Sequence, residues 1–280
     1  MTTELPPTSS TSRSQRVVVG LGAIALAAGV VATYVALQPT PVAAPYPVGD
    51  NASALSPGTS PTASEAFAGL KGYHQTAAVT FTGSTLPKGW TVFSGPIHGD
   101  TGAYYDSRFV RVANGVLSIK TDHSYRNNHG WASGGLCQCG VSHTSGAYFV
   151  RSQTIGSGPD DIAMLWPTND KWPPEIEFVE SSNGTSGRAI VYWGAKRHHA
   201  SFYFSKIKPQ QWHTWGVVWT KSKVTFVLDG QSWAQLTNQA AIPTQTLRLD
   251  IEQQTYCALH FACPSKPTQT HVAWVAEYQQ

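Results

Sequence analysis

QWHTWGVVWTKSKVTFVLDG, residues 211–230, carries the clearest fold signal in this chain. Two runs of strand length, 215–219 and 224–228, are rich in the β-branched and aromatic residues that favour β-strands. Asp229-Gly230 follows the second run, and glycine accepts the positive φ angle that a tight hairpin turn requires. The stretch therefore predicts antiparallel strands, with a further strand over residues 231–236.

Strand-length apolar runs recur in the rest of the chain and are separated by turn residues. They cover residues 115–119, 147–150, 162–166, 189–193, 202–204, 247–251 and 272–275. No segment after residue 37 shows a sustained 3.6-residue period. Many short strands without intervening helices predict an all-β sandwich or jelly roll. We place this domain at residues 72–280, a length that suits one sandwich with a sizeable core.

The residues before this domain predict a membrane attachment and a spacer. Residues 17–37 contain no charge, and about 20 apolar residues span a bilayer as a helix. Basic residues precede this run and do not recur until Lys71, which predicts a cytoplasmic segment 1–16 and an external remainder. We expect an uncleaved anchor, and a removed signal peptide is the alternative. Residues 38–71 are rich in Pro, Ser and Thr and predict a disordered linker.

The composition excludes several classes of function. Charged residues make up 12% of the chain, against roughly 25% in an average soluble protein, which argues against a dense basic surface for nucleic acid. No G-x-S-x-G, P-loop or H-E-x-x-H motif supports a serine hydrolase, a nucleotide-binding enzyme or a zinc protease. The 10 tryptophans instead fit an extracellular β-rich domain with a surface on which sugar rings stack.

Four cysteines, Cys137, Cys139, Cys257 and Cys263, predict two disulfides in an exported domain. In an extended strand, Cβ atoms two residues apart lie roughly 6–7 Å from each other, which is too far for a disulfide. Either the segment that contains Cys137 and Cys139 is a turn, or each of them pairs with Cys257 or Cys263. A zinc site is the rival interpretation.

Three glutamates lie close together in the motif WPPEIEFVE. Side chains alternate between the two faces of a strand, so Glu175 and Glu177 share one face. Glu180 joins them if a one-residue bulge occurs at Phe178 or Val179. Neighbouring carboxylates repel each other, which raises at least one pKa and leaves a proton beside an ionised group. Retaining glycosidases need such a pair, whereas a solvated acidic strand is the alternative interpretation.

This motif resembles the E-I-D-x-x-E signature of glycoside hydrolase family 16, in its bulged, laminarinase-like form. The segment 211–230 is similar to a pair of strands in that family, and residues 114–117 and 145–148 fit in order and spacing. The resemblance covers most of residues 80–280. It implies a β-jelly roll with a substrate cleft across its concave sheet.

The resemblance also implies roles for the glutamates. Glu175 falls on the nucleophile and Glu180 on the acid/base of the family. Glu177 stands where the family normally has Asp, a residue that orients the nucleophile, and the added methylene moves this carboxyl by about 1.5 Å, enough to change the rate. The segment 272–275 lacks an Asp that often accompanies a structural calcium, so we expect no metal and no cofactor.

Aromatic and polar residues near these acids are candidates for binding the sugar chain. An indole ring complements the apolar C–H face of a sugar. His213 either reaches the cleft or bonds a backbone carbonyl as a structural histidine, and Trp131 either closes one end of the cleft or belongs to the core. The predicted substrate-binding set is Trp166, Trp172, Trp131, Tyr192, His213 and Gln254.

These observations predict a retaining endo-glycosidase that hydrolyses a β-linked glucan, with 1,3 or mixed 1,3-1,4 linkages. The alternative on the same fold is a non-hydrolytic or transglycosylating protein that binds carbohydrate or remodels cell walls. We expect a monomer held at the cell membrane with its catalytic domain outside, or secreted if the N-terminal segment is cleaved. The expected partners are a polysaccharide and the membrane, and no nucleic acid.

Overall fold

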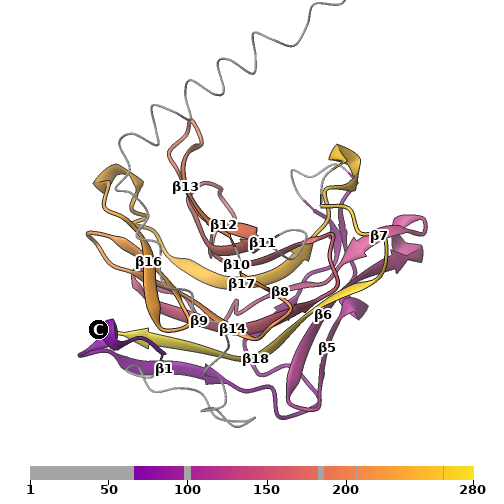
Figure 1. Ribbon diagram of the computed structural model, residues 1–280, viewed down its shortest axis with the longest axis horizontal. Helices are drawn as coiled ribbons and strands as arrows, with labels where there is room; N and C mark the ends of the chain where they lie inside the picture. Colours follow the sequence, from indigo (N-terminus) through magenta and orange to yellow (C-terminus); the bar gives the residue numbers. More distant parts are fainter. Residues whose placement is uncertain (1–65, 98–101, 182–185, 206, 261) are drawn as a thin grey trace, which may run out of the picture. The chain divides into compact units, whose positions relative to one another are not determined.

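The computed structural model of this protein describes residues 66–97, 102–181, 186–205, 207–260 and 262–280 (Figure 1). The predicted segments 1–16 and 17–37, and most of the predicted linker 38–71, lie outside these residues. Within the described part of the chain, no helix is both long and apolar enough to cross a membrane.

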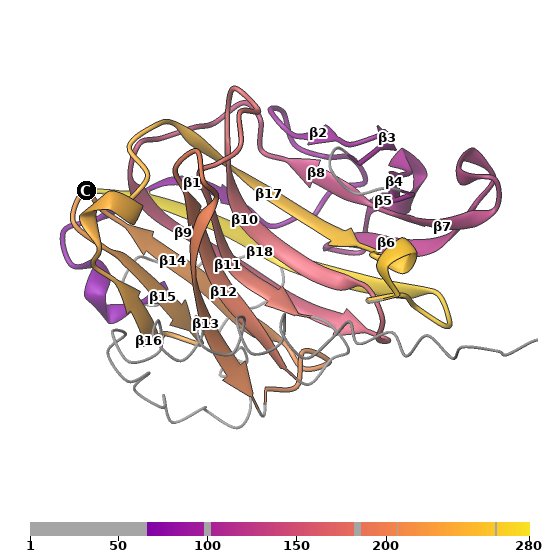
Figure 2. The same ribbon diagram turned by 90° about the horizontal axis from the view of Figure 1, so that it is seen from above.

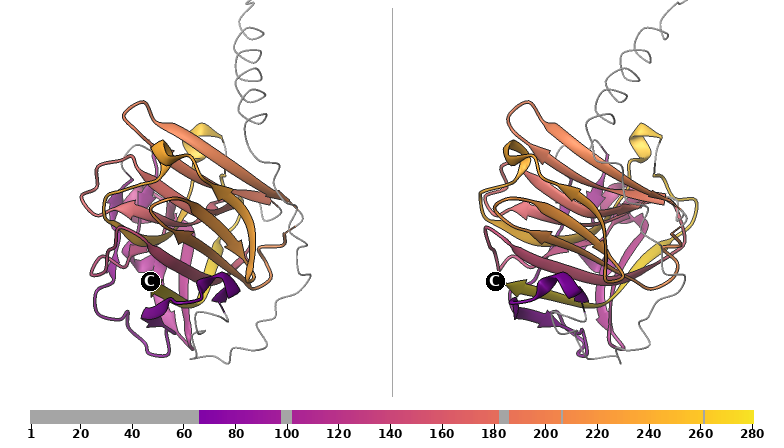
Figure 3. Two further views of the ribbon diagram at one scale, coloured as in Figure 1. Left: turned by 90° about the vertical axis from the view of Figure 1, so that its left-hand side faces the viewer. Right: turned by 60° about the vertical axis from the view of Figure 1, so that its left-hand side comes forward.

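The described residues form two stacked β-sheets, which Figures 1 and 3 show as two layers. The larger sheet has 11 strands: β1 (His74–Val79), β3 (Gly95–Pro96), β4 (Tyr104–Tyr105), β5 (Val110–Ala113), β6 (Val116–Ser124), β7 (Gly130–Ser133), β9 (Gly146–Ile155), β14 (His213–Trp219), β15 (Val224–Leu228), β16 (Gln231–Leu236) and β18 (Thr268–Gln279). The smaller sheet has 7 strands: β2 (Thr91–Val92), β8 (Gly135–Cys137), β10 (Asp160–Pro167), β11 (Glu175–Ser181), β12 (Ser186–Trp193), β13 (His198–Ser205) and β17 (Leu247–Gln254).

Short 3-10 turns connect some of these strands. They are η2 (Ala68–Leu70), η3 (Ser107–Phe109), η4 (Tyr125–Asn127), η5 (Gln239–Ala241) and η6 (Cys257–Leu259). The apolar runs that the sequence predicts as strands fall inside strands, except that Gly115 lies in the turn before β6, and the predicted hairpin forms β14, β15 and β16. The prediction of an all-β sandwich is therefore confirmed for the described residues.

The order of the strands sets up the site. The seven-stranded sheet runs β13-β12-β11-β10-β17-β8-β2, and its neighbouring central strands pair antiparallel. Figure 2 shows β10, β11, β12 and β13 side by side, with β17 next to β10. Segments that are far apart in the sequence, such as β11 and β17, are thus separated by only one strand.

The core lies between the sheets because one face of each strand is apolar. On β17, Leu247, Leu249 and Ile251 belong to the core, while the residues between them point the opposite way. We call the face of the seven-stranded sheet that points away from this core the outer face. A second apolar cluster, which includes Phe149 and Tyr278, lies on the far side of the larger sheet.

The packed domain begins slightly earlier than the sequence suggested. Ala66 and Leu70 are buried in the second apolar cluster. The predicted boundary at residue 72 therefore needs correction by a few residues, because small apolar side chains in the linker were not distinguished from its polar composition.

The four cysteines form two local disulfides. Cys137 pairs with Cys139, with Cα atoms 5.0 Å apart, and Cys257 pairs with Cys263, with Cα atoms 4.6 Å apart. β8 ends at Cys137, and the chain turns there, as the bond from Val141 N to the Gln138 carbonyl shows. The first of the two predicted alternatives, a turn, is therefore correct.

Candidate active site

The three glutamates of the WPPEIEFVE motif lie together on the outer face of β11. Met164 of β10 pairs with Glu177, and the residue before it, Ala163, pairs with Val179. Phe178 is therefore the extra residue of a bulge. Phe178 and Val179 both belong to the core, and Glu180 returns to the face of Glu177. The predicted bulge is confirmed, and it gathers the three carboxyl groups on one face of one strand.

These carboxyl groups are buried and influence one another. Each of the three residues is less than a tenth exposed. Burial, followed by the charges of Glu175 and Glu180, raises the pKa of Glu177 well above its usual value. Burial also raises the pKa of Glu175, although hydrogen bonds from Glu177 and Trp172 act against this shift. Of these two carboxyl groups, Glu177 is therefore the one that holds a proton more strongly.

Two of the predicted aromatic residues surround Glu175. The indole Nε1 of Trp172 donates a 2.6 Å hydrogen bond to Glu175 Oε2. Tyr192 of β12 is the cross-strand partner of Glu175, and its ring centroid lies 5.2 Å from that of Trp172. The guanidinium of Arg197 lies 4.9 Å from the Trp172 ring centroid, on the loop between β12 and β13. Both predicted residues thus lie beside the predicted nucleophile.

Trp166 and Gln254 lie on neighbouring strands of the same face. Trp166 is half-buried on β10, pairs with Arg248 of β17, and donates from its indole to Asp170 at 3.2 Å. Gln254 ends β17, and its Oε1 accepts a 2.7 Å hydrogen bond from the Tyr256 hydroxyl. Their positions leave the predicted role in substrate binding open to experiment.

Arg188 is a site residue that sequence reasoning missed. It is the cross-strand partner of Glu180, and its Nε and Nη2 contact both oxygens of that carboxylate, the second at 3.0 Å. The sequence offers no signal for this pair, because the contact depends on the register between β11 and β12. A bidentate arginine is a strong partner of a carboxylate, so Arg188 fixes the orientation of the Glu180 side chain.

β17 adds two further acids to the outer face. Asp250 and Glu252 alternate with the core residues of that strand. Burial raises the pKa of Asp250 to about 7, against the opposing effect of Arg248, and raises that of Glu252 to about 8. The hydroxyl of Tyr105 donates a short hydrogen bond to Glu252 Oε2. The alternation in LRLDIEQQ could have indicated these acids, because its polar residues share one face.

His213 does not belong to this site, which corrects the prediction of a substrate-binding role. It lies on β14 of the other sheet, where Nδ1 lies 2.7 Å from Asp229 Oδ2 and Nε2 lies 3.2 Å from the Lys208 carbonyl. The side chain is 4% exposed. With both ring nitrogens occupied, His213 is the structural histidine that the sequence analysis gave as the alternative.

Trp131 is also separate from the three glutamates. It lies on β7 of the larger sheet, half-buried, with its ring centroid 4.1 Å from that of His123. Its backbone carbonyl accepts a 2.6 Å hydrogen bond from Asn127. The structure therefore does not place Trp131 beside the acids, and its predicted role at the end of a cleft remains a prediction.

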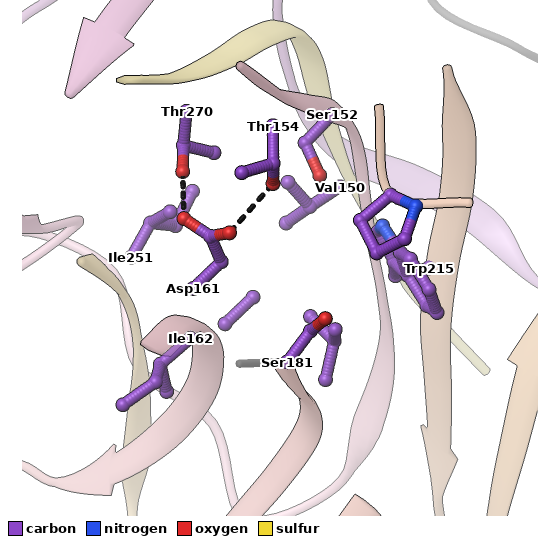
Figure 4. A pocket seen from close by; sticks show the side chains of 12 residues that line it. Val150, Ser152, Thr154, Asp161, Ile162, Ser181, Trp215, Ile251 and Thr270 are labelled. Atoms are coloured by element: carbon purple, nitrogen blue, oxygen red, sulfur yellow. Dashed lines mark hydrogen bonds between the residues drawn. The ribbon is translucent and has the colours of Figure 1, made fainter. Parts of the chain in front are cut away.

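A cavity in the structure lies inside the sandwich, on the opposite side of β10 from the glutamates (Figure 4). Asp161 points into it and accepts hydrogen bonds from Thr154 at 2.6 Å, from Gln253 at 2.8 Å, and from Thr270. Burial raises the pKa of Asp161 to about 6, although all three hydrogen bonds oppose the shift. This carboxyl joins strands of both sheets and has a structural role.

The site offers acid–base and nucleophilic chemistry through carboxyl groups. In the described part of the chain, no three or more His, Cys, Asp and Glu side chains are arranged to hold a metal ion. Glu175 is a buried carboxyl with an aromatic wall on one side, and Glu180 lies three residues beyond the helper Glu177. Such a pair can form and break a bond to a sugar.

Comparison with known proteins identifies the family of this chain. Residues 106–271, more than half of the chain, match the model of glycosyl hydrolases family 16, and they include all three glutamates. The chain belongs to this family. No protein of curated function matches the sequence.

Solved structures share the fold at low sequence identity. A non-specific endo-β-1,3(4)-glucanase, crystallised as a mutant with 1,3-β-D-cellotriosyl-glucose, is 20% identical with a TM-score of 0.66, over 81% of this chain and 100% of that one. The endo-β-1,3-glucanase of Pyrococcus furiosus is 19% identical with a TM-score of 0.64, over 74% and 94%. The laminarinase of Rhodothermus marinus is 18% identical with a TM-score of 0.65, over 74% and 97%. At these identities the likeness supports the jelly-roll fold alone.

Proposed function

We propose that this protein is a retaining endo-β-glucanase that hydrolyses 1,3-β or mixed 1,3-1,4-β linkages. The observation that carries this proposal is the bulge at Phe178, which places Glu175, Glu177 and Glu180 on one face. Membership of glycosyl hydrolases family 16 supports the reaction class. The solved β-glucanases of the same fold support the choice of glucan.

The reaction would proceed by two displacements. Glu175 attacks the anomeric carbon, and the bond from that carbon to the leaving oxygen breaks while Glu180 gives its proton to the oxygen. Water then attacks the glycosyl-enzyme ester, and Glu180 takes a proton from the water as Glu175 leaves. No cofactor takes part in either step.

The helper carboxyl has a defined task in this scheme. Glu177 and the Trp172 indole each donate a hydrogen bond to Glu175, and both hydrogen bonds favour the ionised nucleophile against the effect of burial. When Glu175 loses its charge in the ester, the proton on Glu177 is no longer stabilised by that charge. Although Glu177 is one methylene longer than the Asp of the family signature, its carboxyl still forms a hydrogen bond with Glu175.

Arg188 supports a second candidate on the same site. Its bidentate contact occupies both oxygens of Glu180, the group that hydrolysis would use as acid and base. A transglycosylase would form the same intermediate with Glu175 and pass the sugar to a hydroxyl group of another chain rather than to water. A non-hydrolytic binding protein would retain only the polysaccharide contacts.

A reducing-end assay distinguishes these candidates. We expect wild-type protein to release reducing sugar from laminarin and mixed-linkage glucan, and Glu175→Gln to lose at least about 10³-fold of that rate. Equal signals from the two proteins would remove the enzymatic interpretation. Longer products without net release of reducing ends would favour the transglycosylase.

We also propose that residues 17–37 attach the protein to the cell membrane, with the catalytic domain outside as a monomer. The uncharged 21-residue run and the basic residues before it support this proposal. Two local disulfides fit an oxidising compartment. Membrane fractionation of the full chain tests it, since a cleaved leader would leave the protein in the medium.

A further inference from the structure

Glu252 occupies a position on the outer face that the proposed reaction does not use. Ile162 of β10 pairs with Glu180 on one side and with Glu252 on the other, so the two acids lie on one line across the sheet. Neighbouring strands are about 4.8 Å apart, which puts the Cα atoms of Glu180 and Glu252 about 10 Å from each other. A sugar chain that crosses these strands at Glu180 therefore passes over Glu252.

The surroundings of Glu252 hold its carboxyl in one orientation. Tyr105 comes from β4 of the other sheet and donates its hydroxyl hydrogen to Glu252 Oε2. Gly135 pairs with Glu252, and a Cβ atom there would lie 2.8 Å from the Phe93 ring and 2.9 Å from the Tyr105 ring. The glycine thus leaves space for two aromatic rings, and these rings support the acid.

The second oxygen of this carboxyl is available to a ligand. In the described part of the chain, Glu252 Oε1 has no hydrogen-bond partner, although the residue is only 3% exposed. Burial, followed by the charges of Asp250 and Glu175, raises the pKa of Glu252 to about 8, although the hydrogen bond from Tyr105 acts against this shift. At neutral pH the carboxyl is therefore mostly protonated, and because Oε2 accepts from Tyr105, the proton lies on Oε1.

The charges around it indicate what kind of ligand fits. The two arginines on the strands of this face are occupied, Arg188 by Glu180 and Arg248 by Asp250 and Asp170, whereas Arg197 lies against the Trp172 ring from the loop after β12. Among the described residues, Glu175, Glu177 and Glu252 have no ion-pair partner, and the buried Glu177 Oε2 has no hydrogen-bond partner at all. A sulfated or uronic sugar would bring a negative charge to carboxyl groups that are already hard to ionise. An uncharged sugar fits this surface.

We propose that Glu252, oriented by Tyr105, is a specificity-determining residue that donates a hydrogen bond to a hydroxyl group of an uncharged sugar, at a subsite across the sheet from Glu180. This inference rests on the proposed function, because it takes a glucan chain to be the ligand. The proposal adds a group that binds the sugar chain at a distance from the glycosidic bond that is cleaved.

Calorimetric binding of laminarihexaose to Glu175→Gln tests the proposal without hydrolysis. Adding Glu252→Ala should weaken binding about tenfold, the effect of one lost hydrogen bond in a buried site. Glu252→Gln keeps a donor and should bind within about threefold of the Glu175→Gln parent. Tyr105→Phe leaves the acid without its orienting contact and should weaken binding about threefold or more. A carboxymethylated laminarin oligosaccharide should bind more weakly than laminarihexaose.

A pH series separates hydrogen-bond donation from a merely structural role. Binding should weaken between pH 6 and pH 9 when Glu252 is present and stay constant with Glu252→Gln. The titratable groups around Glu252 are Asp250 on β17, Asp160 on β10, Glu175 and Glu180 on β11, Tyr105 on β4 and Tyr256 after β17. Asp250 titrates in the same range, so a loss of binding that persists with Glu252→Gln would assign the effect to Asp250 and overturn the proposal.

Glu277→Gln is the matched control. Glu277 is equally buried, with a pKa that burial raises to about 7, but it lies on β18 of the other sheet. It should leave oligosaccharide binding unchanged. Equal affinity with and without Glu252→Ala, or no binding of laminarihexaose by Glu175→Gln, would overturn the inference. Binding that depends on Glu252, together with a wild type that releases no sugar, would sustain the inference and refute hydrolysis.

Discussion

Two buried carboxyl groups, Asp161 and Glu177, lie on opposite faces of the β10–β11 pair and have opposite surroundings. Asp161 faces the core and accepts hydrogen bonds from three neutral side chains. Glu177 faces outward, is as buried, and has an oxygen without a partner. Burial raises the pKa of both. Burial alone therefore does not mark a functional acid; the position of Glu177 beside Glu175 and Glu180 on the outer face does.

The strongest test of this comparison is to remove each carboxyl. Asp161→Ala should lower the free energy of unfolding by about 3 kcal/mol or more, because it leaves three buried donors unpaired. For a domain of this size, that corresponds to a fall in Tm of roughly 10 °C. Glu177→Ala should change Tm much less, since it removes a group whose desolvation is not compensated. Thermal unfolding of the two variants checks this. A larger fall in Tm for Glu177→Ala than for Asp161→Ala would contradict the difference described between the two acids.

The raised pKa values predict how stability depends on pH. The pKa values of Asp161, Asp250, Glu252 and Glu277 are about 6, 7, 8 and 7, all above the values expected for the unfolded chain. The folded state therefore binds protons that the unfolded state releases, and the free energy of unfolding falls as pH rises from about 4 to 8. Scanning calorimetry should give a higher Tm at pH 5 than at pH 8. A Tm that rises over this range would contradict these assignments.

Arg188 can be used to test the acid/base assignment of Glu180. Arg188→Met removes the guanidinium that contacts both oxygens of Glu180, so the kcat/KM profile of this variant should differ from that of wild type. Arg248→Met is the control, because its guanidinium pairs with Asp170 and Asp250 instead. Initial rates on laminarin from pH 4 to 9 measure both. Identical profiles for wild type and Arg188→Met would show that Glu180 is not the acid.

The smallest effect is expected at the helper position. Glu177→Asp restores the residue typical of the family signature and should keep kcat within about threefold of wild type or raise it, because the shorter acid can still donate to Glu175. Reducing-end kinetics and Tm are measured together. If kcat instead collapses by about 10²-fold while Tm is unchanged, the longer side chain is specifically required, and the present account of Glu177 is wrong.

Local sequence predicted a large part of this structure because its signals act between near neighbours. The hairpin of β14 to β16, the apolar strands and the bulge at Phe178 all depend on alternation and turn chemistry within a few residues. The three glutamates could be placed on one face by counting along a single strand. The same reasoning left two alternatives for Cys137 and Cys139, which the end of β8 decides.

Partners that depend on register or strand order could not be predicted in this way. Arg188 meets Glu180, eight positions away, through the register of β11 and β12, and Tyr105 meets Glu252, 147 positions away, through the order of the strands. His213 was misassigned because the hairpin signal gives its strand but not its sheet, and β14 belongs to the sheet away from the glutamates. The role of Trp131 stays a prediction, since a tryptophan beside glycines fits either a sugar platform or a ring contact such as that with His123.

The most direct measurement is to trap the covalent intermediate with a 2-fluoro-substituted β-glucosyl oligosaccharide that carries a good leaving group, and to locate the label by peptide mass spectrometry. We expect the sugar to be bound through the Glu175 side chain to the peptide that contains this residue, and we expect no label on Glu175→Gln. A label on Glu177 or Glu180, or turnover of laminarin without any covalent adduct, would contradict it.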